Sequence, residues 1–222
     1  MATNYNPSVV TSGLVLALDA GNTKSYPGSG ATWTDLSGRG QNVTLNAACA
    51  YTATKGGGIV FNGSTAYGDF AVNNIFAGSG PFTFESFFYN ISSTGTIINN
   101  YGPGYTTNSL WFFGGGMYLN NASTGYITTT NYSMINGTHH ILVTRDGSGY
   151  FNSWFDGVQY VTNGGPNTAS VAANINWRVG ADVASGAEQF NGHIYLIRAY
   201  NVALSSAQIL QNFNALRGRF GL

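Results

Sequence analysis

The chain alternates between short apolar runs and turns rich in Gly, Asn, Ser and Thr, a pattern typical of β-strands. Strands are predicted at residues 9–18, 58–61, 82–91, 110–113, 117–119, 140–144, 150–155, 158–161, 177–180 and 193–200. Asp156-Gly157 between two of these runs is a strong hairpin signal. Many short strands at this spacing predict a sandwich or a barrel.

Only the end of the chain shows helical spacing. Ser205 and Gln208 form the pattern of a capping box, and apolar residues follow on one helical face. These apolar residues are Ile209, Leu210, Phe213 and Leu216. We expect Gly218 to end this helix and its apolar face to pack on the sandwich. The basic pair Arg217 and Arg219 is expected to cap the helix or to lie in an interface.

No repeat of fixed period and no linker-like block divides the 222 residues. We therefore expect one domain over residues 13–222, preceded by an N-terminal arm over residues 1–12. The pattern as a whole predicts an all-β fold of two antiparallel sheets with one short C-terminal helix.

Charge is scarce, since eight Lys and Arg and eight Asp and Glu make up 7% of the chain and cancel. Nucleic-acid binding requires clustered basic residues, so it is not expected. No window holds the roughly 18 apolar residues of a membrane-spanning helix. The N-terminus lacks a basic region, and its apolar run stops at Asp19, which predicts a strand and no secretory signal. The protein is expected to be made in a cytoplasm.

The sequence offers little for metal, cofactor or redox chemistry. Cys49 is the single cysteine, so no intramolecular disulfide is possible and a small buried residue is expected. His139, His140 and His193 lie in or beside predicted strands, where a structural hydrogen bond is the expected role. No cofactor and no metal site are predicted.

Enzymatic activity is not expected either. Glycoside hydrolysis uses two carboxylates at a defined separation. The only two glutamates, Glu85 and Glu188, are far apart in the sequence, and Asp146 and Asp156 precede glycines in predicted turns. No Gly-x-Ser-x-Gly elbow is present.

Aromatic residues in polar loops leave sugar binding open. Tyr101, Tyr105 and Tyr126 lie in Gly/Asn/Thr-rich loops, and Trp33 is a further candidate for a sugar-stacking face. The loop at residues 99–108 is the segment favoured for glycan or protein contact. Trp111, Trp154 and Trp177 lie in apolar runs and are expected in the core.

A hydrophobic loop at residues 74–77 is a candidate interface patch, with Ile75 and Phe76 as its apolar residues. Together with Arg217 and Arg219, these residues are the candidates for protein contact. A symmetric homo-oligomer is expected, with a trimer as the favoured state.

Four stretches in order resemble the laminin-G-like, concanavalin A-like lectin/glucanase domains. They are GIVFNGSTAY (58–67), FTFESFFYN (82–90), THHILVTRDGSGYFNSWFDGVQY (138–160) and FNGHIYLIRAYNVALSSAQI (190–209). The resemblance implies a jelly-roll sandwich. Some relatives carry calcium, for which Asp19, Asp35 and Asp69 would be the early acids here. Where many relatives have acidic residues, however, this chain has Ser64-Thr65-Ala66 and Ile194-Tyr195-Leu196.

Two further stretches resemble structural proteins of tailed bacteriophages. Residues 13–45 resemble the opening of laminin-G-like domains in such proteins, and ILQNFNALRGRFGL (209–222) resembles their ends. This resemblance implies a non-enzymatic virion protein, with the major capsid protein or tail proteins as partners. Capsid decoration is the favoured role, and a tail-tip or fibre-head protein is its nearest rival. The alternative is a lectin module that attaches to surface glycan.

Overall fold

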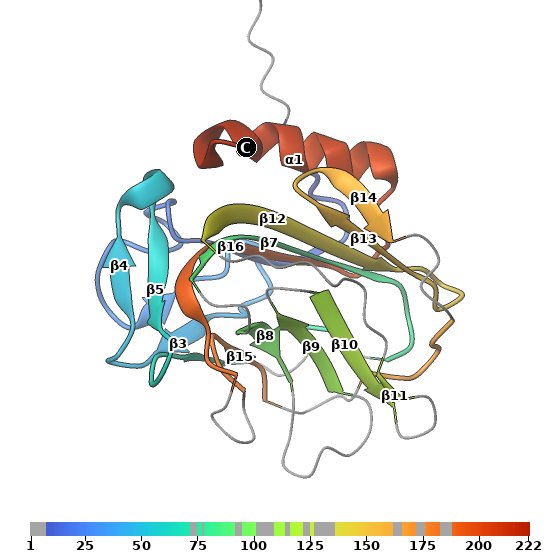
Figure 1. The fold of residues 1–222 in the computed structure, drawn as a ribbon, viewed down its shortest axis with the longest axis horizontal. Coiled ribbons are helices and arrows are strands. Elements are labelled where there is room, and N and C mark those ends of the chain that lie inside the picture. Colours follow the sequence, from blue (N-terminus) through green and yellow to red (C-terminus); the bar gives the residue numbers. More distant parts are fainter. Residues whose placement is uncertain are drawn as a thin grey trace, which may run out of the picture.

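The computed structural model describes most of the chain. The described residues are 8–71, 75–76, 78–91, 95–100, 109–113, 116–121, 125–126, 136–161, 166–171, 176–182 and 188–222. They form two eight-stranded antiparallel sheets and one helix, in three layers (Figure 1). The expected two-sheet jelly-roll sandwich with a C-terminal helix is therefore confirmed.

Sheet A, the central layer, is covered by the helix on one face and by sheet B on the other. Its strand order is β14 (Val158–Val161), β13 (Phe151–Phe155), β12 (Gly137–Arg145), β7 (Phe82–Asn90), β16 (Asn191–Tyr200), β5 (Gly58–Asn62) and β4 (Ala50–Thr52), and β1 (Leu14–Asp19) also pairs with β16. A short 3-10 turn, η1 (Thr54–Gly56), joins β4 to β5.

Sheet B forms the outer layer opposite the helix. Its strand order is β11 (Gly125–Tyr126), β10 (Gly116–Asn121), β9 (Ser109–Phe113), β8 (Thr96–Asn99), β15 (Arg178–Val179), β6 (Gly68–Phe70), β3 (Val43–Leu45) and β2 (Thr32–Trp33). Strands far apart in the sequence are thereby brought side by side.

Aromatic rings fill the space between the two sheets. Phe84 of β7 stacks on Phe112 of β9 with ring centroids 3.8 Å apart, and Phe76 lies against Phe82 at 4.8 Å. Trp177 is fully buried in this cluster. Burial of such rings is worth about 1.5–3 kcal/mol each, so these contacts are a major source of stability.

Strand β16 is apolar on both faces because both faces are covered. Ile197 and Ala199 face the core, whereas Leu196 and Tyr200 pack beneath the helix. β7 has the same character and pairs with β16 along most of its length. Its place between β7 and β5 in the middle of sheet A explains why so few of its positions are polar.

The helix α1 (Ser206–Phe220) begins with the predicted capping box, in which the Ser205 side chain accepts from the Gln208 amide. It does not end at Gly218, as expected from the sequence. Gly218 lies inside the helix, and the left-handed C-cap is Gly221, with φ of 75°. Phe213 and Phe220 stack on Phe87 of sheet A and extend the buried face of the helix to its last turn.

A buried polar network joins the helix to sheet A. The fully buried Glu85 carboxylate accepts from His140 Nε2 at 3.1 Å and from Asn212 Nδ2 at 3.1 Å, and Arg198 Nη1 lies 3.5 Å away. Asn212 also donates to the Tyr200 hydroxyl at 2.9 Å. Each element packed here contributes a partner, so this network fixes how the helix lies on the sheet.

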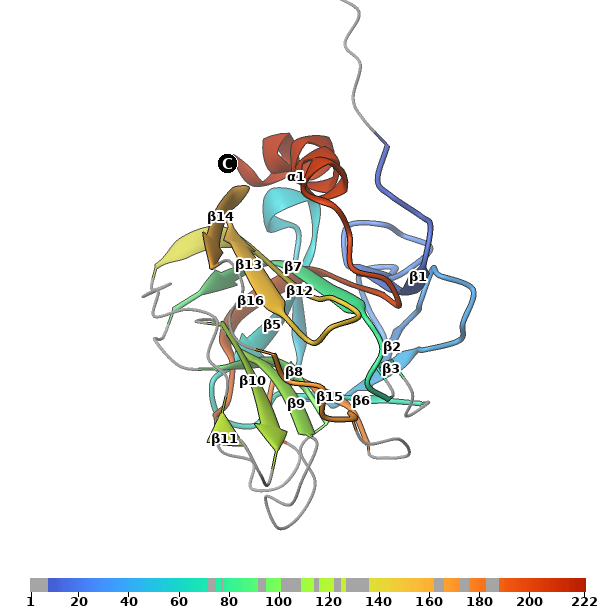
Figure 2. The same ribbon diagram turned by 90° about the vertical axis from the view of Figure 1, so that its right-hand side faces the viewer.

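The N-terminal part of the described chain lies beside the helix. The Val10 amide donates to Asn212 Oδ1 at 2.8 Å, and the Ser8 carbonyl accepts from Gln211 Nε2 at 2.6 Å. Figure 2 shows this segment on one side of α1 and β14 on the other. The strand expected from residue 9 begins only at Leu14, because Thr11 accepts a turn hydrogen bond from the Leu14 amide.

The predicted hairpin at Asp156-Gly157 is present. Both residues have positive φ, 47° and 80°, as a type I′ turn requires. The Asp156 carboxylate accepts from the His140 amide at 2.8 Å and lies 3.0 Å from His139 Nδ1. Its role is therefore to hold the hairpin against β12.

Candidate functional site

The tryptophan expected to offer a sugar-stacking face is instead a core residue. Trp33 has no exposed surface, because β2 turns its side chain toward the layer between the sheets. That expectation was wrong. Trp154 and Trp177 are buried as expected.

The tyrosine candidates fall largely outside the described residues. Tyr101 and Tyr105 are among the undescribed residues, as is most of the loop at 99–108. Tyr126 is described only in its backbone, which pairs with Asn120 at the edge of sheet B. Their proposed contact with sugar stays a prediction.

The expected apolar interface patch is not on the surface. Ile75 and Phe76 are both only 4% exposed, because they pack into the core beside Phe82 and Trp177. Arg217 is exposed on the helix, consistent with a surface role. Ile75, Phe76 and Arg217 were each expected to contact another protein. For Ile75 and Phe76 that expectation was wrong.

Arg219 is occupied within the chain. It lies 2.7 Å from Asp19 Oδ1 and 2.9 Å from Asp19 Oδ2, and its Nε donates to the Lys55 carbonyl at 2.9 Å. It thus holds the end of α1 against β1 and η1. Its expected role in an interface stays a prediction.

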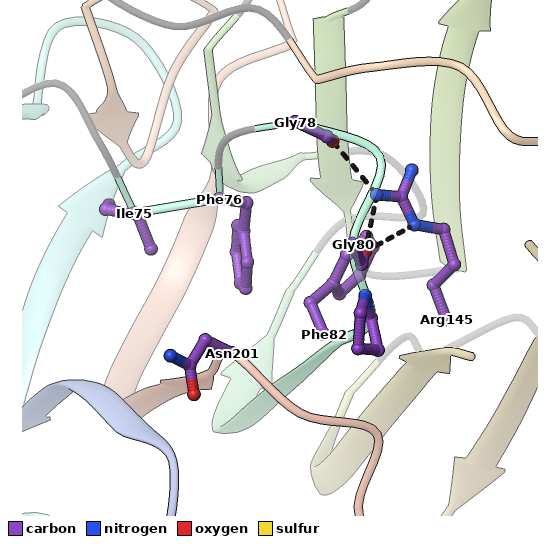
Figure 3. Close-up of a pocket in the computed structure, with 8 residues that line it drawn as sticks. Ile75, Phe76, Gly78, Gly80, Phe82, Arg145 and Asn201 are labelled. Carbon is purple, nitrogen blue, oxygen red and sulfur yellow. Dashed lines mark hydrogen bonds between the residues drawn. The ribbon is translucent and has the colours of Figure 1, made fainter. Parts of the chain in front are cut away.

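A small cavity lies beneath the segment at residues 75–82, and its lining stabilises the fold. Its volume is about 50 Å³, which suits water molecules and not a sugar ring (Figure 3). The buried Arg145 at its wall donates to the carbonyls of Gly78, Gly80 and Ala169. Burial lowers the pKa of this guanidinium to about 10, and its donors are used to hold these loops.

Most acidic groups have structural partners. Glu85 is sealed beneath the helix, and Asp35 accepts from the amides of Ala17, Ser37 and Gln41. Asp146 accepts from two amides of its own turn. Across the described parts of the chain, no three His, Cys, Asp or Glu side chains gather in a way that could hold a metal ion.

Cys49 is half-buried and lies against the Tyr67 carbonyl and Asn46. Burial raises the pKa of its thiol to about 11. The thiol is therefore protonated at neutral pH and unreactive. Among the described residues, no helix is both long and apolar enough to cross a membrane.

The remaining candidate is a polar row across the outer face of sheet B. Cross-strand pairing brings together Thr32, Thr44, Asp69, Arg178 and Asn99, in that order, from β2, β3, β6, β15 and β8. Their neighbours in each strand, such as Val43, Phe70 and Val179, face the core. We call these five positions the sheet B row.

The centre of the row is an ion pair on an aromatic ring. Arg178 Nε lies 2.7 Å from Asp69 Oδ1, and Arg178 Nη2 lies 3.2 Å from Asp69 Oδ2. The guanidinium carbon lies 4.0 Å from the centroid of the Tyr67 ring. The Asp69 side chain is 46% exposed and that of Arg178 is 19% exposed. The pair is thus held rigidly while it faces solvent.

Asn99 lies next to Arg178 in the row. Its amide nitrogen donates to the Ala181 carbonyl at 3.4 Å, whereas its oxygen, fully buried, has no hydrogen-bond partner among the described residues. Buried acceptors usually have a partner. An unused acceptor therefore lies beside the ion pair.

The register continues beyond Asn99 into two aromatic positions. The backbone of Trp111 in β9 pairs with Asn99, and that of Tyr118 in β10 pairs with Trp111. Sequence reasoning considered Asp69 only as a calcium ligand and missed Arg178. The available signal was one charged residue between apolar neighbours in a short run, in Gly68-Asp69-Phe70 and in Trp177-Arg178-Val179.

Comparison with known proteins gives the chain its context. Residues 62–210 match the family model of the concanavalin A-like lectin/glucanases superfamily. No curated protein sequence matches the chain.

Several solved structures share the fold at low sequence identity. Domain 4 of the extracellular GH43 arabinanase AbnA from Geobacillus stearothermophilus, in complex with arabinotriose, has a TM-score of 0.67 and 17% identity, covering 90% of this chain and 97% of that one. The binding domain of botulinum neurotoxin serotype D has a TM-score of 0.68 and 13% identity, covering 92% and 52%. A Trypanosoma rangeli sialidase in complex with sialic acid has a TM-score of 0.64 and 16% identity, covering 95% and 34%. The chain thus spans about half of the toxin domain and a third of the sialidase.

Proposed function

Because this chain belongs to the concanavalin A-like lectin/glucanase superfamily, we propose that it is a non-catalytic domain that binds carbohydrate on the outer face of sheet B. The observation that carries the proposal is the Arg178–Asp69 pair, which faces solvent in a polar row and rests on Tyr67. A related fold, the arabinanase domain, is in complex with arabinotriose, which supports the same class of ligand.

The chemistry of the row suits a sugar. Vicinal hydroxyl groups both donate and accept hydrogen bonds, and the ion pair offers acceptors on Asp69 and N–H groups on Arg178. Because the two side chains already fix each other, a ligand need not immobilise them, which lowers the entropic cost of binding. Thr44 adds an exposed hydroxyl beside Asp69.

Several features support binding without hydrolysis. A glycosidase needs one carboxylic acid that can donate a proton and a second carboxylate nearby. The Asp69 carboxylate is already paired with Arg178, and it is the only carboxylate among the five positions of the sheet B row. Glu85 lies beneath the helix, out of reach of a polysaccharide. Release of reducing sugar from a bound polysaccharide would contradict this part of the proposal.

The test is the variant Arg178→Ala against the control Arg217→Ala. Both remove one arginine, but Arg217 is exposed on the helix, in the layer opposite sheet B (Figure 1). We expect binding on a glycan array to fall at least about tenfold for Arg178→Ala, because a charge-assisted contact is worth roughly 1.5–3 kcal/mol. Binding should be unchanged for Arg217→Ala. Equal binding by both variants would exclude this face as the site.

We further propose that the domain is part of a tailed-phage particle. Capsid decoration is the favoured role, and a tail-tip or fibre-head protein is its nearest rival. The support is the resemblance of residues 13–45 and 209–222 to structural proteins of such phages. Quantitative mass spectrometry of purified particles tests this role. Hundreds of copies per particle would indicate decoration, a few copies a tail component, and absence would exclude the virion role.

A further inference from the structure

We propose that the ligand of the sheet B row is an uncharged glycan, and that Asp69 is the residue that excludes sugars bearing carboxylate, sulfate or phosphate. This inference rests on the proposed carbohydrate-binding function. It concerns the charges near the row. The location of every Lys and Arg side chain relative to the row can be stated.

All eight Lys and Arg residues lie within the described parts of the chain. Three of the arginines are committed elsewhere. Arg145 is bonded to loop carbonyls, Arg198 lies beside Glu85, and Arg219 is paired with Asp19. Lys24, Arg39, Lys55 and Arg217 lie outside the strands of sheet B. Arg178 is therefore the one cation on a strand of this sheet.

The charge of Arg178 is already neutralised. Both of its contacts with Asp69 are at hydrogen-bond distance, and its Nη1 donates to the Asp182 carbonyl at 3.4 Å. One face of the guanidinium lies over Tyr67. An anionic ligand could form a two-bond ion pair with this cation in the place of Asp69 only by displacing it. Asp69 is held beside Arg178 by the fold, so its effective concentration there is far above that of a dilute sugar.

What the row offers to a ligand is mainly acceptors. The Asp69 carboxylate is nearly half-exposed, and the exposed Thr44 hydroxyl beside it can also accept a hydrogen bond. Acceptors favour O–H donors, which every neutral sugar supplies. The Asp69 carboxylate repels an incoming carboxylate, because the two charges have the same sign and Arg178 is already paired.

This arrangement makes a gain of function possible at a single residue. Asp69→Asn keeps the size of the side chain but removes its charge, so Arg178 becomes an unpaired cation above Tyr67. We expect this variant to bind anionic sugars that the unchanged protein rejects. Asp146→Asn is the matched control, since it removes the same charge at the β12–β13 turn and retains an acceptor for the turn amides.

The experiment measures binding to an array of oligosaccharides in matched pairs, such as galactose oligomers printed beside galacturonic acid oligomers. For the unchanged chain and for Asp146→Asn, we expect the neutral member to bind at least about tenfold more tightly, with little change between about 50 and 500 mM salt. For Asp69→Asn, this preference should shrink by about tenfold or reverse, and binding of the uronate should weaken with salt. Thermal unfolding checks that each variant is folded, and Asp69→Ala repeats the test with a smaller side chain.

Three results would overturn the inference in distinguishable ways. If the unchanged chain prefers the uronates, carbohydrate binding stands but the assignment of an uncharged ligand is wrong. If Asp69→Asn leaves the preference unchanged, Asp69 is not its source. If no glycan on the array binds, the proposed function itself fails and the inference falls with it.

Discussion

Gly192 shows how little freedom a single residue has at the centre of sheet A. It lies in β16 between β5 and β7, paired with Phe61 on one side and Asn90 on the other. A Cβ atom built there would overlap the carbonyl oxygen of Tyr89. The glycine is thus required by the close approach of two backbones and not by a turn.

Replacement of this glycine should be costly. We expect Gly192→Ala to lower the free energy of unfolding by about 2–4 kcal/mol, because the overlapping atom belongs to a backbone that cannot rotate away. Urea unfolding followed by tryptophan fluorescence measures this change. Gly147→Ala is the control, since nothing lies within 4 Å of the added atom, and a loss of the same size in both variants would disprove the steric explanation.

At the scale of elements, two glycines near the end of α1 differ in whether their backbone conformation requires glycine. Gly218 lies inside the helix with no atom within 4 Å of an added Cβ, whereas Gly221 has the positive φ of a C-cap. We expect Gly218→Ala to stabilise the protein by about 0.5–1 kcal/mol through helix propensity. Gly221→Ala should destabilise it by about 1 kcal/mol, since an alanine is strained at positive φ. Differential scanning calorimetry of the two variants tests this, and the same sign for both would place the helix end elsewhere.

The network beneath the helix predicts a response to acid. Burial raises the pKa of Glu85, but the hydrogen bond from His140, the charges of Arg198 and His140, and the bond from Asn212 outweigh it and hold the pKa below its ordinary value. A carboxyl group with a lowered folded-state pKa contributes stability that is complete above its unfolded-state pKa. This contribution is lost as the pH falls through the folded-state pKa.

We therefore expect the free energy of unfolding to fall steadily below about pH 4.5. Glu85→Gln should remove the part of this slope that belongs to Glu85. It should also cost about 3 kcal/mol at pH 7, because Arg198 is then left buried beside a neutral group. Urea unfolding of both proteins between pH 7 and pH 3 measures the two effects. Parallel curves would show that the acid response arises elsewhere.

At the scale of the whole molecule, the features that could be predicted from the sequence are the local ones. The capping box at Ser205 and the turn at Asp156-Gly157 involve residues within a few positions of each other, and both are present. Long strands such as β7 and β16 were also visible, because each carries a long apolar run.

The sheet B row could not be predicted in this way. It joins positions 32, 44, 69, 178 and 99, which meet only when five short strands pair across the sheet. Strands of two to four residues are too short to show a period of two. The burial of Trp33, Ile75 and Phe76 was also missed, because these residues lie in short segments that show no clear period and look exposed until the rest of the fold covers them.

The pairing of so many charges within the chain has a consequence for how the protein would meet the proposed glycan. A surface with little uncompensated charge produces no long-range electrostatic field. Protein and glycan would therefore meet by diffusion alone, and electrostatic steering would not accelerate their association. If the sheet B row binds glycan as proposed, a single domain would then hold its ligand briefly. Durable attachment would come from many copies acting on one surface, where each release is followed by rapid rebinding of a neighbouring copy.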